Sequence, residues 1–475
     1  MTPDEFREAG HQLIDWIADR RESVEERRVR PDLEPGDLVA ALPDAVSGRP
    51  SSAAEVLADF DALIAPATLE VHHPMHFGWF PSNASLSSVL GDIASSGLGS
   101  LGISWESSPA LTELEEVVLD WLGQLTSLGP EWKGVIQDTA STSCLVAMLA
   151  ARERATDHGQ TRGGLTAETA PLCVYTTSEA HSSVRKAALL AGVGADHIRV
   201  VDVDAYSRDM RVEHLQSLVA HDIGAGRIPM AIVASVGSTG TTAFDPLAEI
   251  VAVAQTCGAW VHADAAMAGS AMVLPEMAHL FQGIDRADSI AWNPHKWFGT
   301  ILDCSLMYVR DPDHLIRVMS TNPSYLRSTA GGEATQYRDW GIPLGRRFRS
   351  LKLWFQLSID GIESIQARLR RDLANAQWLA EQFRSLPDWE VLAPVRLQTV
   401  CVRHVPPALG LDDGAALDEH TLSWVQSINV SGEAFLSPSV LDDRWMARIS
   451  VGVEATERHH LERLIEIMRA AAETP

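Results

Sequence analysis

The chain lacks any surplus of positive charge. Among its 475 residues, 38 Lys and Arg stand against 63 Asp and Glu, which gives a formal net charge of −25 at pH 7. A field of this sign repels nucleic acid and anionic membrane surfaces, so we expect neither as a partner. The net charge does not bear on a small substrate, which responds to the charges that line its own pocket.

Cysteine pairs and long apolar runs are also missing. The five cysteines are far apart and include no CxxC pair: Cys144, Cys173, Cys257, Cys304 and Cys401. Each lies in an apolar run, so we expect buried free thiols, which suit the reducing cytoplasm. No window reaches 18 uninterrupted apolar residues, and the N-terminal stretch has no apolar signal-peptide core. Neither a membrane span nor a signal peptide is therefore expected.

What is present is ordinary globular composition, with 46% hydrophobic and 21% charged residues, in a chain long enough for more than one structural unit. Residues 4–28 and 53–64 carry apolar residues at helical spacing and are joined by a stretch rich in Pro, Gly and Asp. These helices are too short to form a core alone. We expect them to pack on a larger body or on a second subunit.

From residue 171 onward, short apolar strands alternate with helices. The expected strands are 171–177, 197–204, 230–237, 259–266, 287–294 and 304–310. This alternation predicts an α/β fold with a mostly parallel sheet and right-handed crossovers. Asp245 is expected to cap a helix that starts at Pro246 and ends before Gly258. After residue 350, long helices and a few short strands indicate a smaller α+β domain.

A single lysine stands in the neutral stretch SIAWNPHKWFGT, residues 289–300. Lys296 follows an apolar strand and precedes Trp297 and Phe298. One interpretation is that its stem packs while its ammonium group reaches water, as in many surface lysines. The other is that its amine is a nucleophile whose pKa is lowered by desolvation. This stretch alone leaves both interpretations open.

Three further features lie at the ends of expected strands or at a helix start. Four hydroxyl residues within 139–143 open an apolar helix, where free N–H groups favour a phosphate, although plain N-capping needs only one of them. Asp264 ends an apolar strand and precedes two alanines, which suggests a carboxylate facing a flat group; a strand-end cap is the alternative. His181 follows another strand. Ligands of open parallel sheets bind at such strand ends.

One cofactor needs all of these groups. Pyridoxal phosphate requires an amine for its aldehyde, an acid beside its ring nitrogen, a cradle for its phosphate and a flat contact for its ring. No metal is expected. His72, His73 and His76 are clustered, but no carboxylate or cysteine lies at ligand spacing nearby.

Two other motifs carry less information. The GxGxxG pattern at Gly97, Gly99 and Gly102 follows no apolar strand, so a compact turn is expected there rather than a dinucleotide site. The run HFGWFP at residues 76–81 is either an aromatic wall or core packing, and both interpretations stay open at this point.

The motifs HADAA (262–266), NPHKW (293–297) and PLGRRFRSLKLWF (343–355) resemble those of the group II pyridoxal-phosphate decarboxylases, and look most like the aromatic-L-amino-acid decarboxylases. The resemblance runs in order over nearly the whole chain. It implies pyridoxal 5'-phosphate as cofactor and the aspartate-aminotransferase-like fold, fold type I. It also implies a homodimer with the active site at the subunit interface. The implied parts are an N-terminal helical segment (1–70), a large α/β domain (71–350) and a small C-terminal α+β domain (351–475).

By this resemblance, Lys296 is the Schiff-base lysine, Asp264 pairs with the ring nitrogen and His181 stacks on the ring. Tyr325, in a segment whose glycines and small polar residues suit a mobile lid, assists protonation of Cα. The other cofactor positions implied are Thr139, Ala140, Ser141 and Asn293 for the phosphate, Thr239 and Ala266 at the ring, and His295 beside the lysine.

The resemblance also implies the substrate class. The positions that match the substrate side-chain pocket are Trp79, Phe80, Pro81 and Ser82, with Leu101 and Ile103 contributed across the dimer. None of these suits a distal carboxylate, so aromatic L-amino acids are expected rather than glutamate. Departures from the animal enzymes at Val71, Trp79 and Ile103 leave the preferred amino acid open, with a lean towards tryptophan or phenylalanine.

Two reactions are compatible with this scaffold. Similar enzymes that form aldehydes oxidatively tend to replace the tyrosine or the stacking histidine. This chain has both Tyr325 and His181. We therefore expect decarboxylation to the arylalkylamine and CO₂, with an aromatic aldehyde synthase as the alternative.

Overall fold

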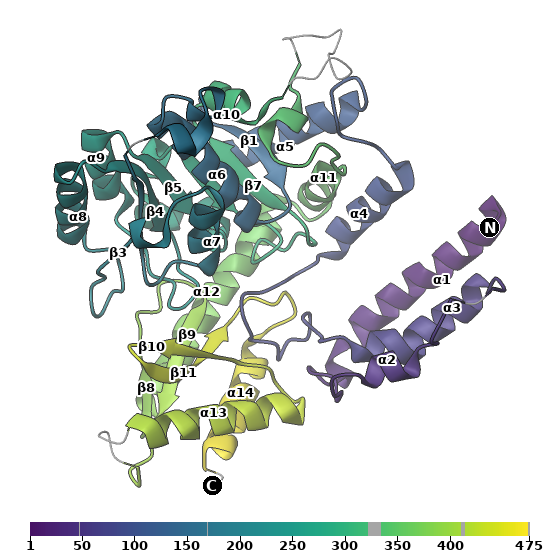
Figure 1. Cartoon of the computed structure of the whole chain (residues 1–475). Coiled ribbons are helices and arrows are strands. Elements are labelled where there is room, and N and C mark those ends of the chain that lie inside the picture. The colour runs from purple at the N-terminus through teal and green to yellow at the C-terminus, as the bar shows by residue number, and fades with distance from the viewer. Residues whose placement is uncertain (47, 169, 322–333, 410–413, 474–475) are drawn as a thin grey trace. The chain divides into compact units, whose positions relative to one another are not determined.

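A computed structural model describes residues 1–46, 48–168, 170–321, 334–409 and 414–473 (Figure 1). The chain divides into two compact units. Unit 1 comprises Met1–Pro81, Glu381–Glu390 and Cys401–Pro475, and unit 2 comprises Ser82–Ala380 and Val391–Val400. In the described part of the chain, no helix combines the length and the apolar character that crossing a membrane requires.

Unit 2 is built on a seven-stranded sheet with the order β1-β7-β6-β5-β4-β2-β3. Its strands are β1 (Lys133–Gln137), β2 (Leu172–Thr177), β3 (Ile198–Val201), β4 (Ile228–Ser235), β5 (Trp260–Asp264), β6 (Ser289–Trp292) and β7 (Ser305–Val309). Strands β6, β5, β4, β2 and β3 run parallel, whereas β7 runs antiparallel to both β6 and β1. The predicted α/β fold with a mostly parallel sheet is confirmed; β1 was not predicted.

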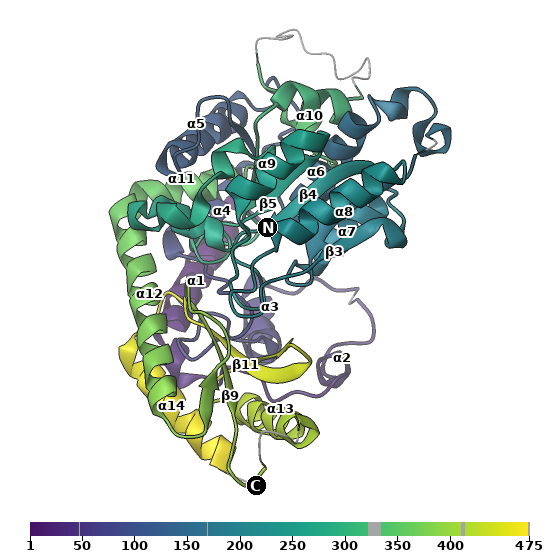
Figure 2. The ribbon, with the colours of Figure 1, turned by 90° about the vertical axis from the view of Figure 1, so that its left-hand side faces the viewer.

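Helices cover both faces of this sheet. The helices of unit 2 are α4 (Leu86–Leu98), α5 (Pro109–Leu125), α6 (Ala140–Ala155), α7 (Ser182–Leu190), α8 (Val212–Gly224), α9 (Leu247–Cys257), α10 (Pro312–Met319), α11 (Ser350–Ile359) and α12 (Ile362–Ser385), the last of which continues into unit 1. Helix α6 packs with α7, and α8 packs with α9; β4 contacts α6, α8 and α9 (Figure 2). Because helices cover both faces, β2 is buried along its whole length, which explains why its residues do not alternate between apolar and charged.

The remaining elements lie mostly in unit 1. They are α1 (Pro3–Glu22), α2 (Asp37–Ala41), α3 (Ala53–Asp59), α13 (Gly414–Ser431) and α14 (Arg458–Glu473), with strands β8 (Trp389–Val391), β9 (Thr399–His404), β10 (Ser437–Leu441) and β11 (Arg444–Ser450). The strands form a four-stranded sheet in the order β10-β11-β9-β8, and β10 pairs antiparallel with β11. Helix α1 ends earlier than predicted because the hydroxyl of Ser23 donates to the carbonyl of Asp19 at 2.6 Å and caps it.

One local prediction was wrong. Asp245 does not cap α9, because Pro246 occupies the N-cap position. The carboxylate of Asp245 is buried and accepts the backbone N–H groups of Met210 and Ser235, each at 2.7 Å. Burial raises the pKa of this carboxyl group to about 7. Asp245 therefore joins two distant backbone segments, which the local motif does not reveal.

The GxGxxG segment forms the compact turn that was predicted. Gly99 ends α4 with a φ of +60°, and the N–H of Gly102 donates to the carbonyl of Arg346 at 2.9 Å. A Cβ atom on Gly102 would lie 2.9 Å from the side chain of Leu111, so this close approach requires glycine. Gly258 ends α9 with a φ of +75°, also as predicted.

A buried ion pair joins three segments of unit 2. The side chains of Arg346 and Glu115 are 4% and 0% exposed, and Nη2 lies 2.5 Å from Oε1. The same Oε1 accepts the N–H of Ile136 at 2.8 Å, and Arg346 donates to the Ile136 carbonyl at 2.9 Å. These contacts connect α5, β1 and the chain that leads into α11.

Replacing Glu115 by Gln removes one charge of this pair and leaves Arg346 buried without its counter-ion. An uncompensated buried charge costs about 3–5 kcal/mol, so we expect a clearly lower thermal unfolding midpoint, measured by circular dichroism. Asp120→Asn on the same helix is the matched control. Asp120 pairs with Lys133 at 3.7 Å, with side chains 55% and 48% exposed, and an exposed pair contributes about 1 kcal/mol or less. Equal midpoints for the two variants would contradict a stabilising role for the buried pair.

Candidate active site

Six strands of unit 2 end at one edge of the sheet, and the predicted cofactor residues follow five of them. Because β7 is antiparallel to both of its neighbours, β1 points in the same direction as β6, β5, β4 and β2. Their carboxyl ends therefore meet on one side. The cofactor residues predicted from the sequence follow these ends: Thr139, Ala140 and Ser141 after β1, His181 after β2, Thr239 after β4, Asp264 and Ala266 at β5, and Asn293, His295 and Lys296 after β6.

Lys296 is singled out among the four lysines of the chain. Lys133 is exposed at the start of β1, and Lys186 is exposed on α7. Lys352 is buried in an ion pair with Asp92 at 3.0 Å. Lys296 is half-buried and is the lysine that follows a strand at the shared edge.

The two aromatic residues after Lys296 anchor its backbone. Trp297 is fully buried, and its Nε1–H donates to Asp372 at 2.9 Å. Phe298 is fully buried and packs edge-on against Trp292, with ring centroids 5.3 Å apart. These contacts explain why a lysine precedes two large apolar rings: the rings fix the turn from which its amine projects.

Asp264 is tied to the same turn. Its Oδ1 accepts the N–H of Ala266 at 3.1 Å, and the carbonyl of Ala266 accepts the N–H of Asn293 at 2.8 Å. Asp264 also lies beside Ala291 in the β5–β6 register. The loops that carry the carboxylate and the lysine are thus hydrogen-bonded to each other.

His181 experiences the charges of both groups. Burial lowers the pKa of its imidazole, Asp264 acts to raise it and Lys296 acts to lower it. Nδ1 accepts the N–H of Ser183 at 3.2 Å and lies 2.7 Å from the Ser183 hydroxyl, which makes His181 the N-cap of α7. Since Nδ1 accepts, the proton of the neutral ring is on Nε2.

His295 is also neutral. Its Nδ1 accepts the N–H of Cys304 at 2.9 Å, and burial together with the neighbouring Lys296 lowers its pKa to about 4. Thr239 is exposed in the turn after β4.

The start of α6 suits an anion. Thr139 is the N-cap residue, and its side chain makes no capping hydrogen bond. The first-turn N–H groups of Ala140 and Ser141 have no acceptor within the helix. Free N–H donors at this helix start, together with a carboxylate and an amine at the same edge of the sheet, fit a phosphorylated ring that carries an aldehyde and a protonated nitrogen.

The predicted substrate wall divides between the two units. Trp79, Phe80 and Pro81 belong to unit 1, and Ser82 begins unit 2. Trp79 is 57% exposed and packs on Phe435 at 5.2 Å, whereas Phe77 is fully buried, so the aromatic run contributes to both surface and core.

Three other predicted residues lie outside the shared edge or outside the described chain. Leu101 is exposed and Ile103 half-buried, both after α4. Tyr325 lies outside the described residues. The roles of these residues remain predictions.

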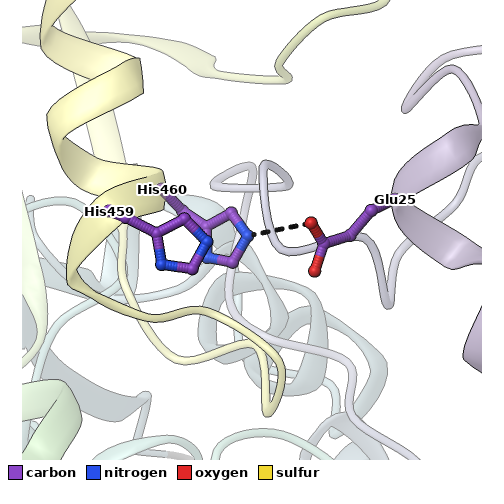
Figure 3. A group of neighbouring side chains, drawn as sticks. All are labelled: Glu25, His459 and His460. Carbon is purple, nitrogen blue, oxygen red and sulfur yellow. Dashed lines mark ion pairs between the residues drawn. The ribbon is translucent and has the colours of Figure 1, made fainter.

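One group of side chains in unit 1 has metal-ligand spacing, Glu25, His459 and His460 (Figure 3). The Nε2 atom of His460 lies 3.4 Å from a carboxylate oxygen of Glu25. However, Nδ1 of His460 accepts the N–H of Glu457 at 3.0 Å, so Nε2 carries the proton and has no lone pair for a cation. The protonated Nε2 faces the carboxylate of Glu25, so the group does not fit a metal site.

Sequence reasoning missed the buried neighbours of Asp264. From the sequence we assigned no role to His262, which lies in the HADAA motif, or to Ser289. Both are fully buried, and Ser289 Oγ lies 2.8 Å from His262 Nδ1. The sequence does contain one indication of this arrangement: side chains alternate between the two faces of a strand, so His262 and Asp264 lie on the same face.

Comparisons with known proteins agree with this geometry. A family model described as the pyridoxal-dependent decarboxylase conserved domain matches residues 35–405. Tryptophan decarboxylase 2 of Oryza sativa subsp. japonica is 36% identical over 99% of this chain and 95% of its own length. Phenylacetaldehyde synthase of Arabidopsis thaliana is 37% identical over 99% and 96%. The crystal structure of Oryza sativa TDC with PLP and tryptamine is 32% identical, covers 99% of this chain and 98% of that one, and gives a TM-score of 0.95.

A negative charge at the start of α6 should exclude an anion. We expect Ser141→Asp to weaken binding of inorganic phosphate to the ligand-free protein by about tenfold or more, because the carboxylate repels the anion and competes for the same N–H groups. Isothermal titration calorimetry measures the dissociation constant. Ser217→Asp, on the exposed side of α8, is the control and should bind as the unchanged protein does. Equal weakening by both variants would contradict an anion site at α6.

Proposed function

The chain belongs to the pyridoxal-dependent decarboxylase family, and we propose that it decarboxylates aromatic L-amino acids to the corresponding arylalkylamine and CO₂. The observation that carries this proposal is the convergence of an amine, a carboxylate and a free helix N-terminus at one edge of the sheet. The cofactor is pyridoxal 5'-phosphate, and membership of the decarboxylase family makes the protein a carboxy-lyase.

Each part of the cofactor has a group suited to it. We assign Lys296 to the aldehyde carbon and Asp264 to the ring nitrogen. The start of α6, with Asn293, is assigned to the phosphate, and His181 to one face of the ring. Thr239, Ala266 and His295 complete the assigned set. When bound, pyridoxal phosphate supplies an electron sink for the bond that breaks between Cα and the carboxylate.

The charges of the chain suit this reaction. The carboxylate of Asp264 keeps a proton on the ring nitrogen beside it. His181 is neutral, because burial lowers its pKa, so its ring adds no cation beside Lys296. With its proton on Nε2, His181 can donate a hydrogen bond to a substrate carboxylate. We assign to the Tyr325 hydroxyl the proton that Cα takes up after CO₂ has left.

Aromatic substrates are favoured by the relatives and by the exposed ring of Trp79. The rice relative is named for tryptophan, and the crystal structure of Oryza sativa TDC is a complex with PLP and tryptamine. Trp79 and Phe80 offer aromatic surface, with the guanidinium of Arg448 4.3 Å from the centroid of the Phe80 ring. We propose that Trp79, Phe80, Pro81 and Ser82 contact the substrate side chain, with Leu101 and Ile103 from a second subunit.

A second candidate reaction is oxidative formation of an aromatic aldehyde. It is favoured by the 37% identity to phenylacetaldehyde synthase over 99% of the chain. The presence of both His181 and Tyr325 favours simple decarboxylation instead. Hydrogen peroxide and ammonia among the products distinguish the two reactions.

We also propose a homodimer with the active site at its interface. On α4, Leu86, Leu90 and Ile93 recur at spacings of four and three residues and are 48%, 46% and 42% exposed. No residue of α1 is buried, and Phe6 on it is 66% exposed. Such surfaces suit a second copy of the chain. In this proposal, residues 1–70 are the dimerisation segment, and 71–350 and 351–475 are the large and small domains.

A cytoplasmic location completes the proposal. It is supported by the five cysteines, which are all free thiols and of which four are buried. Thiols of this kind suit a reducing compartment.

Removing the amine of Lys296 should abolish the chemistry. We expect Lys296→Ala to lose the visible absorption of covalently bound cofactor and to lower CO₂ release from L-tryptophan by about 10³-fold or more. Lys186→Ala, which removes an exposed lysine from α7, is the control and should keep both properties. Absorption spectra and coupled assays for CO₂, tryptamine and peroxide give the readout. Unchanged absorption in Lys296→Ala would refute the assignment, and stoichiometric peroxide from the unchanged enzyme would move the function to aldehyde synthesis.

A charge on the apolar face of α4 should separate the subunits. We expect Leu90→Asp to halve the mass measured by light scattering and to lower activity with it, since burying an unpaired carboxylate is costly. The control is Ile223→Asp, at a 50% exposed position on α8, which should leave the mass unchanged. A Leu90→Asp variant with the mass of the unchanged protein would contradict an interface on α4.

A further inference from the structure

Three side chains that can form hydrogen bonds follow one another along one face of β5 towards the candidate site. The proposed reaction uses only the last of them, Asp264. Trp260, His262 and Asp264 alternate along the strand, so their side chains lie on the same face. His262 is paired in register with Ser289 on β6. Trp260, His262 and Ser289 are 1%, 0% and 0% exposed, so their hydrogen bonds must be made within the protein.

The hydrogen bonds of this row determine where the proton of His262 lies. Trp260 Nε1–H donates to Ser289 Oγ at 2.8 Å, and the same Oγ lies 2.8 Å from His262 Nδ1. An indole N–H can only donate, so the Ser289 oxygen accepts from it. If Nδ1 also carried a proton, two N–H groups would point at one oxygen and the buried hydroxyl hydrogen would have no acceptor. The hydroxyl therefore donates to Nδ1, and the ring proton is on Nε2.

This leaves one donor without a partner. His262 Nε2 is buried and has no hydrogen-bond partner among the residues that the structure describes. An unpaired buried N–H is costly, so its position requires an explanation. Burial lowers the pKa of His262 to about 4, and the one charge that opposes this effect is that of Asp264. The ring is therefore neutral, and the carboxylate is its electrostatic neighbour.

We propose that His262 is a positioning residue for Asp264. Trp260 and Ser289 hold its imidazole as the Nε2–H tautomer, and this N–H steadies the Asp264 carboxylate beside the ring nitrogen of the cofactor. The inference rests on the proposed function. An N–H dipole on the same face of the strand as a carboxylate favours its ionised form, and an ionised carboxylate retains the proton on the ring nitrogen.

Four variants of the full-length protein test the proposal. His262→Phe keeps a ring and removes both nitrogens, whereas His262→Gln keeps an N–H donor near the position of Nε2. Ser289→Ala removes the hydroxyl that fixes the tautomer. Ser270→Ala is the matched control, since Ser270 is equally buried and also accepts from a tryptophan, Trp292 Nε1, at 3.1 Å.

The first readout uses the cofactor-loaded enzyme. We expect His262→Phe to lower kcat by about 10–100-fold, because the carboxylate loses the N–H group that favours its ionised form, with KM for L-tryptophan within about twofold. The visible absorption of the bound cofactor should show loss of the ring-nitrogen proton at lower pH. In Ser289→Ala, both kcat and the pH at which the ring-nitrogen proton is lost should fall by smaller amounts. His262→Gln should recover most of the lost kcat, and Ser270→Ala should match the unchanged enzyme.

The second readout uses the protein without cofactor. Nitrogen-15 NMR of labelled histidine, with the His262 signals identified by their absence in His262→Gln, should show a proton on Nε2 and none on Nδ1. In Ser289→Ala the two tautomers should mix.

Several results would overturn the proposal. They are equal losses in His262→Phe and His262→Gln, a Ser289→Ala enzyme indistinguishable from Ser270→Ala, or a proton on Nδ1 of His262. If His262→Phe does not fold, the two serine variants decide. An unchanged protein that binds no pyridoxal phosphate would refute the proposed function instead, and the NMR result would still test the arrangement of Trp260, Ser289 and His262.

Discussion

The shared direction of five strands is the constraint on which the rest of the site depends. Strands β1, β2, β4, β5 and β6 all end at one edge of the sheet of unit 2, because β7 lies antiparallel to both β6 and β1 and so leaves these two strands parallel to each other. Residues separated by up to 157 positions, from Thr139 to Lys296, are brought together by that geometry. The loop bond from Asn293 N–H to the carbonyl of Ala266, at 2.8 Å, then holds the lysine turn against the carboxylate turn.

Three histidines of this edge share one arrangement. In His181 and His295, Nδ1 accepts a backbone N–H, and in His262 it accepts a hydroxyl, so each neutral ring has its proton on Nε2. Burial lowers the pKa of His262 and of His295 to about 4. These rings therefore act as fixed donors rather than as charges. Among the residues assigned to the cofactor, the formal charges are those of Lys296 and Asp264, which is the polarity that a protonated pyridine with an aldehyde requires.

Much of this could be predicted from the sequence because the signals are local. An apolar strand that ends in a polar residue identifies Asp264 and the turn of Lys296, and the alternation of strands and helices predicts the sheet that aligns them. Other features depend on distant partners. The local sequence predicts that Asp245 caps a helix, but its carboxylate accepts hydrogen bonds from the N–H groups of Met210 and Ser235. Strand β1 is short, and no local pattern predicts it. The position of the proton on His262 depends on a tryptophan and a serine from two different strands.

The central claim is that Lys296, among four lysines, holds the cofactor. The most direct measurement is to reduce the pyridoxal-phosphate-loaded protein with borohydride, digest it and locate the added pyridoxyl phosphate by mass spectrometry. We expect the added mass on the peptide that contains Lys296, at about one per chain. Added mass on a peptide containing Lys133, Lys186 or Lys352, or no stable addition to any lysine, would contradict it.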